Sequence, residues 1–144
     1  MTTDNFTAFQ EKFRVAEFAI FKNNGWTLSL RPNQATLGSC ILSLNRACES
    51  FADITPDEAA QLAKIVHYAD GQLQAAFAFD KINYLMLMMV DHHVHFHVIP
   101  RYADTKDFVG VIFEDANFPR PPDLGGVAVN DTQANEIIAV IKKA

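Results

Sequence analysis

The chain has 144 residues, of which 49% are hydrophobic and 20% are charged, and its formal net charge is −5. This length and composition predict one soluble globular domain, residues 1–144, with a buried core. The negative charge, without any basic cluster, argues against nucleic-acid binding because the phosphate backbone would repel the surface. A small anionic ligand stays possible, since it needs only local positive charge and backbone donors.

Membrane association and secretion are not expected either. The longest strongly apolar run, residues 84–90, is far too short to cross a bilayer. The first residues lack a basic segment followed by an apolar one, so we expect no secretory signal. Cys40 and Cys48 have no spacing motif, which indicates reduced thiols. Together these features predict a cytoplasmic protein.

The first half of the chain contains several strand patterns. Residues 13–21 are apolar-rich and suit one or two short strands, and the Asn-Asn-Gly at 23–25 favours a tight hairpin turn. Residues 26–31 alternate as a half-buried strand does, and after a connection at 32–38 the alternation returns at 39–44. The residues expected to face the core are Trp26, Leu28, Leu30, Cys40, Leu42 and Leu44.

A long amphipathic helix is predicted over residues 56–78. Thr55 can cap it, Pro56 fits its first turn, and Glu58 follows the cap by three residues. Behind this start the apolar residues keep the spacing of one helical face. They are Leu62, Ile65, Val66, Ala69, Leu73, Ala76 and Phe77.

The second half of the chain is less regular. Residues 84–90 form a continuous, Met-rich apolar run, which predicts a strand covered on both faces. Residues 91–92 are expected to form a short turn into an antiparallel partner strand. Pro100 has no backbone N–H to donate to a neighbouring strand, so it marks the end or edge of that strand. A last helix is expected from Asp131, which can cap it.

Four of the five histidines lie within residues 92–97. On a strand, alternate side chains point to opposite faces, so three apolar residues would enter the core while three imidazoles share the other face. Their Cα atoms would be about 6.6 Å apart. The imidazoles of this row are those of His93, His95 and His97.

Three interpretations of the row are open. It could be a solvated strand face, or it could ligate zinc with a further ligand such as His67 or Asp91. The third interpretation is nucleophilic catalysis, which we favour. A neutral imidazole has a free nitrogen that can attack phosphorus, while its neighbours bind phosphate oxygens or hold the ring in the right tautomer.

The sequence of residues 93–99, HVHFHVI, resembles the signature of the histidine-triad (HIT) superfamily, three histidines separated by apolar residues. Pro100-Arg101 is similar to the fragile-histidine-triad branch of that superfamily. Residues 37–38 and 51–58 are similar to the segment that leads from a strand into the family's long helix. The resemblance covers about residues 15–102, and the segment 103–144 lies outside it.

The resemblance implies an α+β fold with an antiparallel sheet of about five strands, a long amphipathic helix and a C-terminal helix, paired into a homodimer. It also implies a nucleotide-binding hydrolase or nucleotidyl transferase that cleaves at the α-phosphate through a covalent nucleotidyl-histidine intermediate. By this resemblance His95 is the nucleophile, His97 contacts the phosphate and His93 orients the site. No metal or other cofactor is implied, although Mg²⁺ could accompany the substrate as a counter-ion.

The chain departs from the family pattern just before the triad. Residues 87–92 lack the family's Gly, Gln and Ser or Thr, so the phosphate-binding loop is expected to be a bare turn. In its place Asp91 would repel phosphate and His92 could help to bind it.

Other substrate-binding positions also differ. No Asn lies at 27–31, where the family often contributes one to the ribose, and Asn33 lies just beyond. Arg101 could neutralise phosphate. These departures keep open the alternative of a nucleotide-binding module of the same fold with little turnover. A metal-dependent hydrolase that uses the histidine cluster is a further alternative. The sequence names neither the base nor the leaving group.

Overall fold

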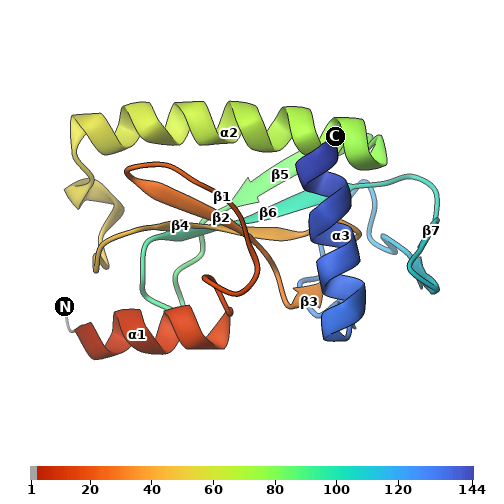
Figure 1. Cartoon of the computed structure of the whole chain (residues 1–144), viewed down its shortest axis with the longest axis horizontal. Coiled ribbons are helices and arrows are strands. Elements are labelled where there is room, and N and C mark those ends of the chain that lie inside the picture. Colours follow the sequence, from red (N-terminus) through yellow and green to blue (C-terminus); the bar gives the residue numbers. More distant parts are fainter. Residues whose placement is uncertain (1–2) are drawn as a thin grey trace.

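A computed structural model describes residues 3–144 and shows a central antiparallel sheet between helices (Figure 1). The strands follow the order β1-β2-β4-β6-β5. They are β1 (Ala19–Lys22), β2 (Trp26–Leu30), β4 (Cys40–Leu44), β5 (Lys81–Leu85) and β6 (His95–Arg101). This architecture confirms the predicted α+β fold with five antiparallel strands.

Three helices surround the sheet. The long helix α2 (Pro56–Phe77) covers one face, and α1 (Thr3–Lys12) lies on the opposite side (Figure 1). The C-terminal helix α3 (Asp131–Lys143) packs against α2. The remaining elements are short: η1 (Phe51–Asp53), the pair β3 (Asn33–Gln34) with β9 (Val127–Ala128), and the pair β7 (Lys106–Phe108) with β8 (Val111–Phe113).

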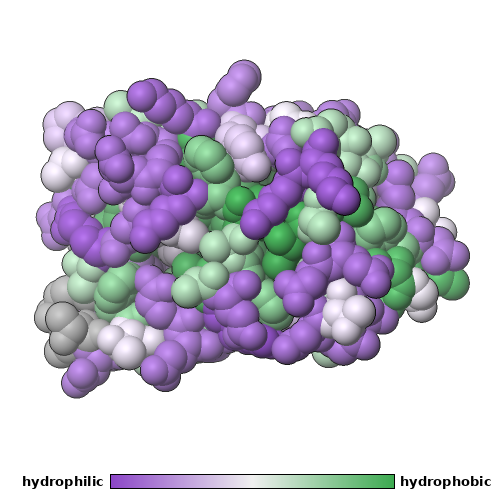
Figure 2. Space-filling model, viewed as in Figure 1, coloured by the Kyte–Doolittle hydropathy of each residue, from purple (hydrophilic) through white to green (hydrophobic). Residues whose placement is uncertain are grey.

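The main core lies between the sheet and α2, where the alternation of β2 and β4 predicts it. All six apolar residues predicted to face the core on these strands are buried in one cluster, and Cys40 and Cys48 are free thiols within it. Helix α2 contributes Ile65, Ala69, Leu73 and Phe77. On the face of the molecule shown in Figure 2, hydrophobic residues reach the surface in the middle and toward the right-hand end, between hydrophilic ones.

The start of α2 confirms the capping prediction. The Thr55 side chain accepts a hydrogen bond from the Glu58 amide, and the Glu58 carboxylate accepts one from the Thr55 amide. These two bonds satisfy two of the amides that a helix start leaves free. At the other end, Ala78 adopts a left-handed conformation with φ 50° and terminates the helix.

The strand predicted at 84–90 is wrong beyond its first two residues. Strand β5 ends at Leu85, whose partner is His97. The chain then continues as a loop, residues 86–94, in which Met89 and Val90 are 79% and 84% exposed. An apolar run alone does not distinguish a buried strand from a loop that continues past the edge of the sheet.

Two terminal predictions also need correction. Residues 3–12 form α1 and residues 13–18 form turns, so within the predicted strand region only residues from Ala19 onward form a strand. The last helix is capped by Asn130, which accepts from the Gln133 amide, and Asp131 is its first residue. Across residues 3–144, none of the helices combines the length and apolar character that crossing a bilayer demands.

Candidate active site

Two of the three histidines project from β6 on the side of the sheet that α1 covers. In the register of β4 and β6, His95 lies opposite Ser43 and His97 opposite Ile41. His93 precedes the strand instead of belonging to it. The three residues are only 1%, 2% and 8% exposed in chain order, so the interpretation as a solvated face is wrong.

Aromatic side chains around α1 bury the row. The Phe9 ring centroid lies 4.9 Å from those of both His93 and His95, and the Phe6 centroid lies 4.7 Å from that of His93. Phe13 extends the cover, with centroids 6.1 Å from His95 and 6.4 Å from His97. The sequence interpretation missed this cover, although these three Phe follow one another at intervals of three and four, the spacing of a helical face.

Backbone carbonyls determine the tautomers of two imidazoles. His95 Nδ1 lies 2.5 Å from the carbonyl oxygen of His93, and His93 Nε2 lies 2.8 Å from that of Leu44. A carbonyl oxygen only accepts, so each of these nitrogens carries the proton and donates. In neutral His95 the lone pair is therefore on Nε2.

All three imidazoles are held in the neutral form. Burial, the first cause in each case, lowers the pKa of His93, His95 and His97 below the ordinary value. For His97 the pKa falls to about 4, because the positive charge of Arg31, and that of His95 once it is protonated, adds to the effect of burial. At neutral pH the row therefore offers uncharged nitrogens.

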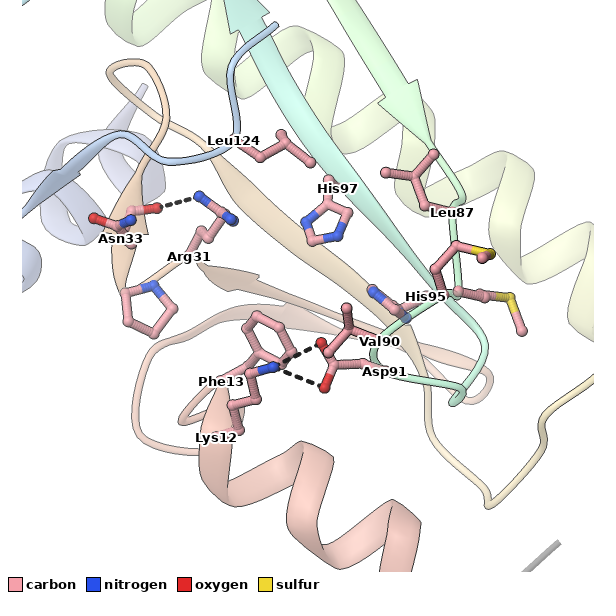
Figure 3. A pocket seen from close by; sticks show the side chains of 13 residues that line it. Lys12, Phe13, Arg31, Asn33, Leu87, Val90, Asp91, His95, His97 and Leu124 are labelled. Atoms are coloured by element: carbon pink, nitrogen blue, oxygen red, sulfur yellow. Dashed lines mark hydrogen bonds and ion pairs between the residues drawn. The ribbon is translucent and has the colours of Figure 1, made fainter.

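His95 and His97 open into a cavity of about 470 Å³ (Figure 3). One part of its wall is apolar and consists of Phe13, Pro32, Leu87, Met88, Met89, Val90 and Leu124. Its other polar residues are Arg31, Asn33 and an ion pair between Lys12 and Asp91. The Lys12 Nζ lies 2.9 Å from the Asp91 carboxylate, which ties the end of α1 to the loop before β6.

The predicted binding residues are distributed unevenly around this cavity. Asn33 lines it, with its side-chain amide donating to the carbonyl of Gly125. His92 lies outside, exposed, with Nε2 3.2 Å from the Met89 carbonyl oxygen, and lines a neighbouring hollow beside α1. Asp91, expected as a bare repelling anion, is neutralised by Lys12.

Arg101 also lies outside the cavity. It belongs to β6, is 4% exposed, and forms an ion pair of 2.7 Å with Asp115. It also donates to the Asn83 side chain and to the Arg120 carbonyl. The structure therefore places its charge in a compensated internal network and does not bring it to the histidines.

Arg31 is a polar cavity residue that the sequence analysis did not identify. Its Nη1 donates to the Asn33 carbonyl over 2.8 Å, while its Nε is buried and has no hydrogen-bond partner among the described residues. The alternation of polar and apolar residues along β2 could have indicated this position. Ser29 pairs with Ile41, which pairs with His97, so the polar positions of β2 share the sheet face of the histidines.

The described geometry contains no ready metal site. Within residues 3–144, no group of three or more His, Cys, Asp or Glu side chains is arranged to hold a metal ion. His67, a candidate third ligand, is exposed on α2, which covers the other face of the sheet (Figure 1). A zinc ion bound by protein needs at least three converging ligands.

The sequence of the chain matches the model of a known family. A model of the HIT domain matches residues 12–104, and the chain therefore belongs to the HIT family. Membership places it in a superfamily of nucleotide-binding hydrolases and transferases. No curated protein sequence matches the chain.

Solved structures with the same fold are distant in sequence. A histidine-triad protein of Sinorhizobium meliloti is 22% identical, with 90% of this chain and 92% of that chain covered and a TM-score of 0.71. One from Bradyrhizobium japonicum is 19% identical, with the same coverage and a TM-score of 0.70. A Zn-bound family protein from Mycobacterium smegmatis is 16% identical, with 88% and 84% covered and a TM-score of 0.60. At these identities the similarity shows the fold alone.

Proposed function

We propose that the protein is a nucleoside phosphate hydrolase or nucleotidyl transferase that cleaves at the α-phosphate through a covalent nucleotidyl-histidine intermediate. One observation carries this proposal. The His93 carbonyl accepts from His95 Nδ1, so the lone pair of His95 is on Nε2, and His95 lines a cavity that a small molecule can enter. A neutral imidazole with an accessible lone pair is a competent nucleophile toward phosphorus.

The reaction runs in two displacements. His95 Nε2 attacks the α-phosphorus, and a P–N bond forms while the bond to the leaving group breaks. The leaving group keeps the electron pair of that bond and takes a proton from water. A water molecule then attacks phosphorus and loses a proton, while the P–N electron pair returns to Nε2. If another hydroxyl replaces this water, the same site acts as a transferase.

Two groups near His95 stabilise the positive charge that develops during attack, whereas burial and the charge of Lys12 act against it. In the adduct its ring is an imidazolium whose Nδ1–H still donates to the His93 carbonyl. The negative charge of Asp91 favours the same charged form. Neutral His97, which lines the cavity beside it, contacts the phosphoryl group without adding a competing positive charge.

The rest of the cavity matches the size and character of a nucleoside. Its volume of about 470 Å³ lies within the usual range for small-molecule sites, which combine apolar walls with a few polar groups. The wall formed by Phe13 and the loop residues from Leu87 to Val90 would pack against a base.

A nucleotide-binding module with little turnover is the alternative, and one observation favours it. Residues 86–94 contain no Gly, Gln, Ser or Thr to donate to the outer phosphates. Losing one well-placed donor can lower turnover about 10²–10³-fold. The two functions differ in whether a covalent adduct forms.

Trapping that adduct is the decisive experiment. The protein is mixed with adenosine and guanosine phosphoramidates, phosphate esters and dinucleoside polyphosphates, quenched in denaturant and measured by intact mass. We expect an added nucleoside monophosphate, mapped to His95 by peptide sequencing. Binding of these compounds without an adduct from any of them would support the module instead.

We also propose a homodimer, as the resemblance implies. β5 lies at one end of the sheet, and an edge strand offers unpaired backbone groups to a second chain. Sedimentation velocity over a range of protein concentrations tests this. A single species with the mass of one chain at all concentrations would contradict it.

A further inference from the structure

Arg31 lies where it can meet a phosphoryl group held by the histidines. It follows directly after β2, on the sheet face that carries His97, and both residues line the cavity. Figure 3 shows its guanidinium pointing toward His97. The charge of Arg31 also contributes to the low pKa of His97, so the two groups are close enough to interact electrostatically.

The cavity has one positive charge that the protein does not compensate. Of its described lining residues, Lys12 and Asp91 neutralise each other, and the imidazoles of His95 and His97 are neutral at pH 7. Arg31 forms no ion pair with any described carboxylate. Its guanidinium remains protonated despite burial, because the free arginine pKa lies far above neutral pH.

The hydrogen bonding of Arg31 is incomplete as well. Asn33 accepts from Nη1 through its backbone carbonyl, which holds the guanidinium in place. The buried Nε has no partner among the described residues. A buried donor on a charged group without an acceptor is costly, and an anion in the cavity that accepts from the guanidinium would reduce that cost.

We propose that Arg31 is the phosphate-recognition residue of this cavity and sets its preference for a single phosphoryl group. It takes the place of the loop donors that residues 86–94 lack. Because the cavity offers one uncompensated cation, the first phosphoryl group gains a partner and further phosphates gain none. This inference rests on the proposed function only in placing a nucleotide in the cavity.

Binding measurements test Arg31 without requiring turnover. Isothermal titration at pH 7.5 compares adenosine, AMP and ATP, and the matching guanosine compounds, on wild type, Arg31→Met and Arg31→Lys. Arg120→Met is the matched control, because it removes the same charge at an exposed residue that does not line this cavity. Melting temperature and circular dichroism establish that each variant folds.

We expect wild type and Arg120→Met to bind the monophosphate at least about tenfold more tightly than the nucleoside, since hydrogen bonds to charged groups have that magnitude. The triphosphate should bind no more than about threefold better than the monophosphate. Arg31→Met should lose the preference for phosphate while its affinity for the nucleoside stays the same. Arg31→Lys, which keeps the charge without the planar fork, should be intermediate.

Several outcomes would overturn the inference. They are an unchanged phosphate preference in Arg31→Met, an equal loss of nucleoside and nucleotide affinity, a triphosphate preference above tenfold in wild type, or no binding by wild type at all. The adduct experiment separates this result from the proposed chemistry. If an adduct forms while Arg31→Met keeps the preference, only the Arg31 inference fails. If the preference depends on Arg31 and no adduct forms, only the proposed chemistry fails.

Discussion

The ring of His95 is oriented by the backbone of His93, since His95 Nδ1 lies 2.5 Å from the His93 carbonyl oxygen. That carbonyl is itself held in place by the following residue. The Val94 amide donates to Cys48 over 2.8 Å, and the Val94 carbonyl accepts from the Leu44 amide over 3.1 Å. The tautomer of the proposed nucleophile therefore depends on how the loop before β6 is attached to the end of β4.

Replacing His95 with Ala should abolish adduct formation and turnover on every active substrate, because no other group supplies the attacking nitrogen. The burial of the ring also predicts an effect on stability. The ring packs against Phe9, so its loss should lower the free energy of unfolding by about 0.5–3 kcal/mol. Intact mass and thermal unfolding measure the two effects. More than a few per cent of residual activity would refute the assignment of the nucleophile.

Stability should fall as the pH is lowered from about 6.5 toward 4. The unfolded histidines take up protons near pH 6.5, whereas burial keeps those of the folded row neutral, down to about pH 4 for His97. Stability is therefore complete above pH 6.5 and is lost through this window, by up to about 1.4 kcal/mol per pH unit for each group. Urea unfolding at half-unit pH steps measures it. His97→Gln should reduce the slope of the unfolding free energy against pH. An unchanged slope would contradict the assignment of this pH dependence to the buried histidines.

Much of the fold is predictable because local rules and tertiary packing agree there. The alternation of β2 and β4 places Trp26 and Cys40 in the core, and the Thr55–Glu58 box sets the start of α2. The strand prediction for residues 86–90 is wrong because apolar side chains such as Met89 line a cavity instead of a core. Hydrophobicity alone does not distinguish these environments.

The candidate site is less predictable than the fold. The triad motif identifies His95 and His97 by their spacing, and both line the cavity. Phe9 and Arg31 reach the site through α1 and β2, which are distant from the triad in sequence. Contacts between distant segments depend on the assembled sheet, and no short motif records them. The same holds for Arg101, whose partner Asp115 is visible only in three dimensions.

The ion pair between Lys12 and Asp91 should tune the pKa of His95. The charge of Asp91 raises this pKa and that of Lys12 lowers it. Lys12→Met should therefore move the acid limb of the adduct-formation rate to higher pH, and Asp91→Asn should move it to lower pH, because the reaction needs neutral His95. The rate measured from pH 4.5 to 8 gives both midpoints. Lys64→Met, at an exposed position on α2, is the control and should leave the midpoint in place.

Chelation should leave most single-turnover activity, because the proposed chemistry assigns no bond-making step to a metal. The described residues form no preformed metal site, whereas a distant relative of the same fold is Zn-bound. Adduct formation is measured after exhaustive dialysis against EDTA, with and without added Zn²⁺ or Mg²⁺. Full loss that stoichiometric Zn²⁺ restores would favour a metal-dependent hydrolase. A partial effect of Mg²⁺ is expected from a counter-ion of the substrate phosphate.

Helix α1 should control the protonation of the histidine row through Phe9. This ring is 3% exposed and lies 4.9 Å from both His93 and His95, where it excludes water. Because burial is the first cause of their low pKa, Phe9→Ala should raise both values toward 6.5.

Titration of the imidazole protons by NMR measures this shift, with exposed His67 as the internal reference. Phe9→Leu is the matched control, because it keeps an apolar cover and should leave both pKa values low. The functional consequence is a lower adduct-formation rate for Phe9→Ala at pH 6, where more His95 is protonated, with recovery at pH 8. If Phe9→Ala folds and the histidine pKa values do not change, then α1 does not set the environment of the nucleophile.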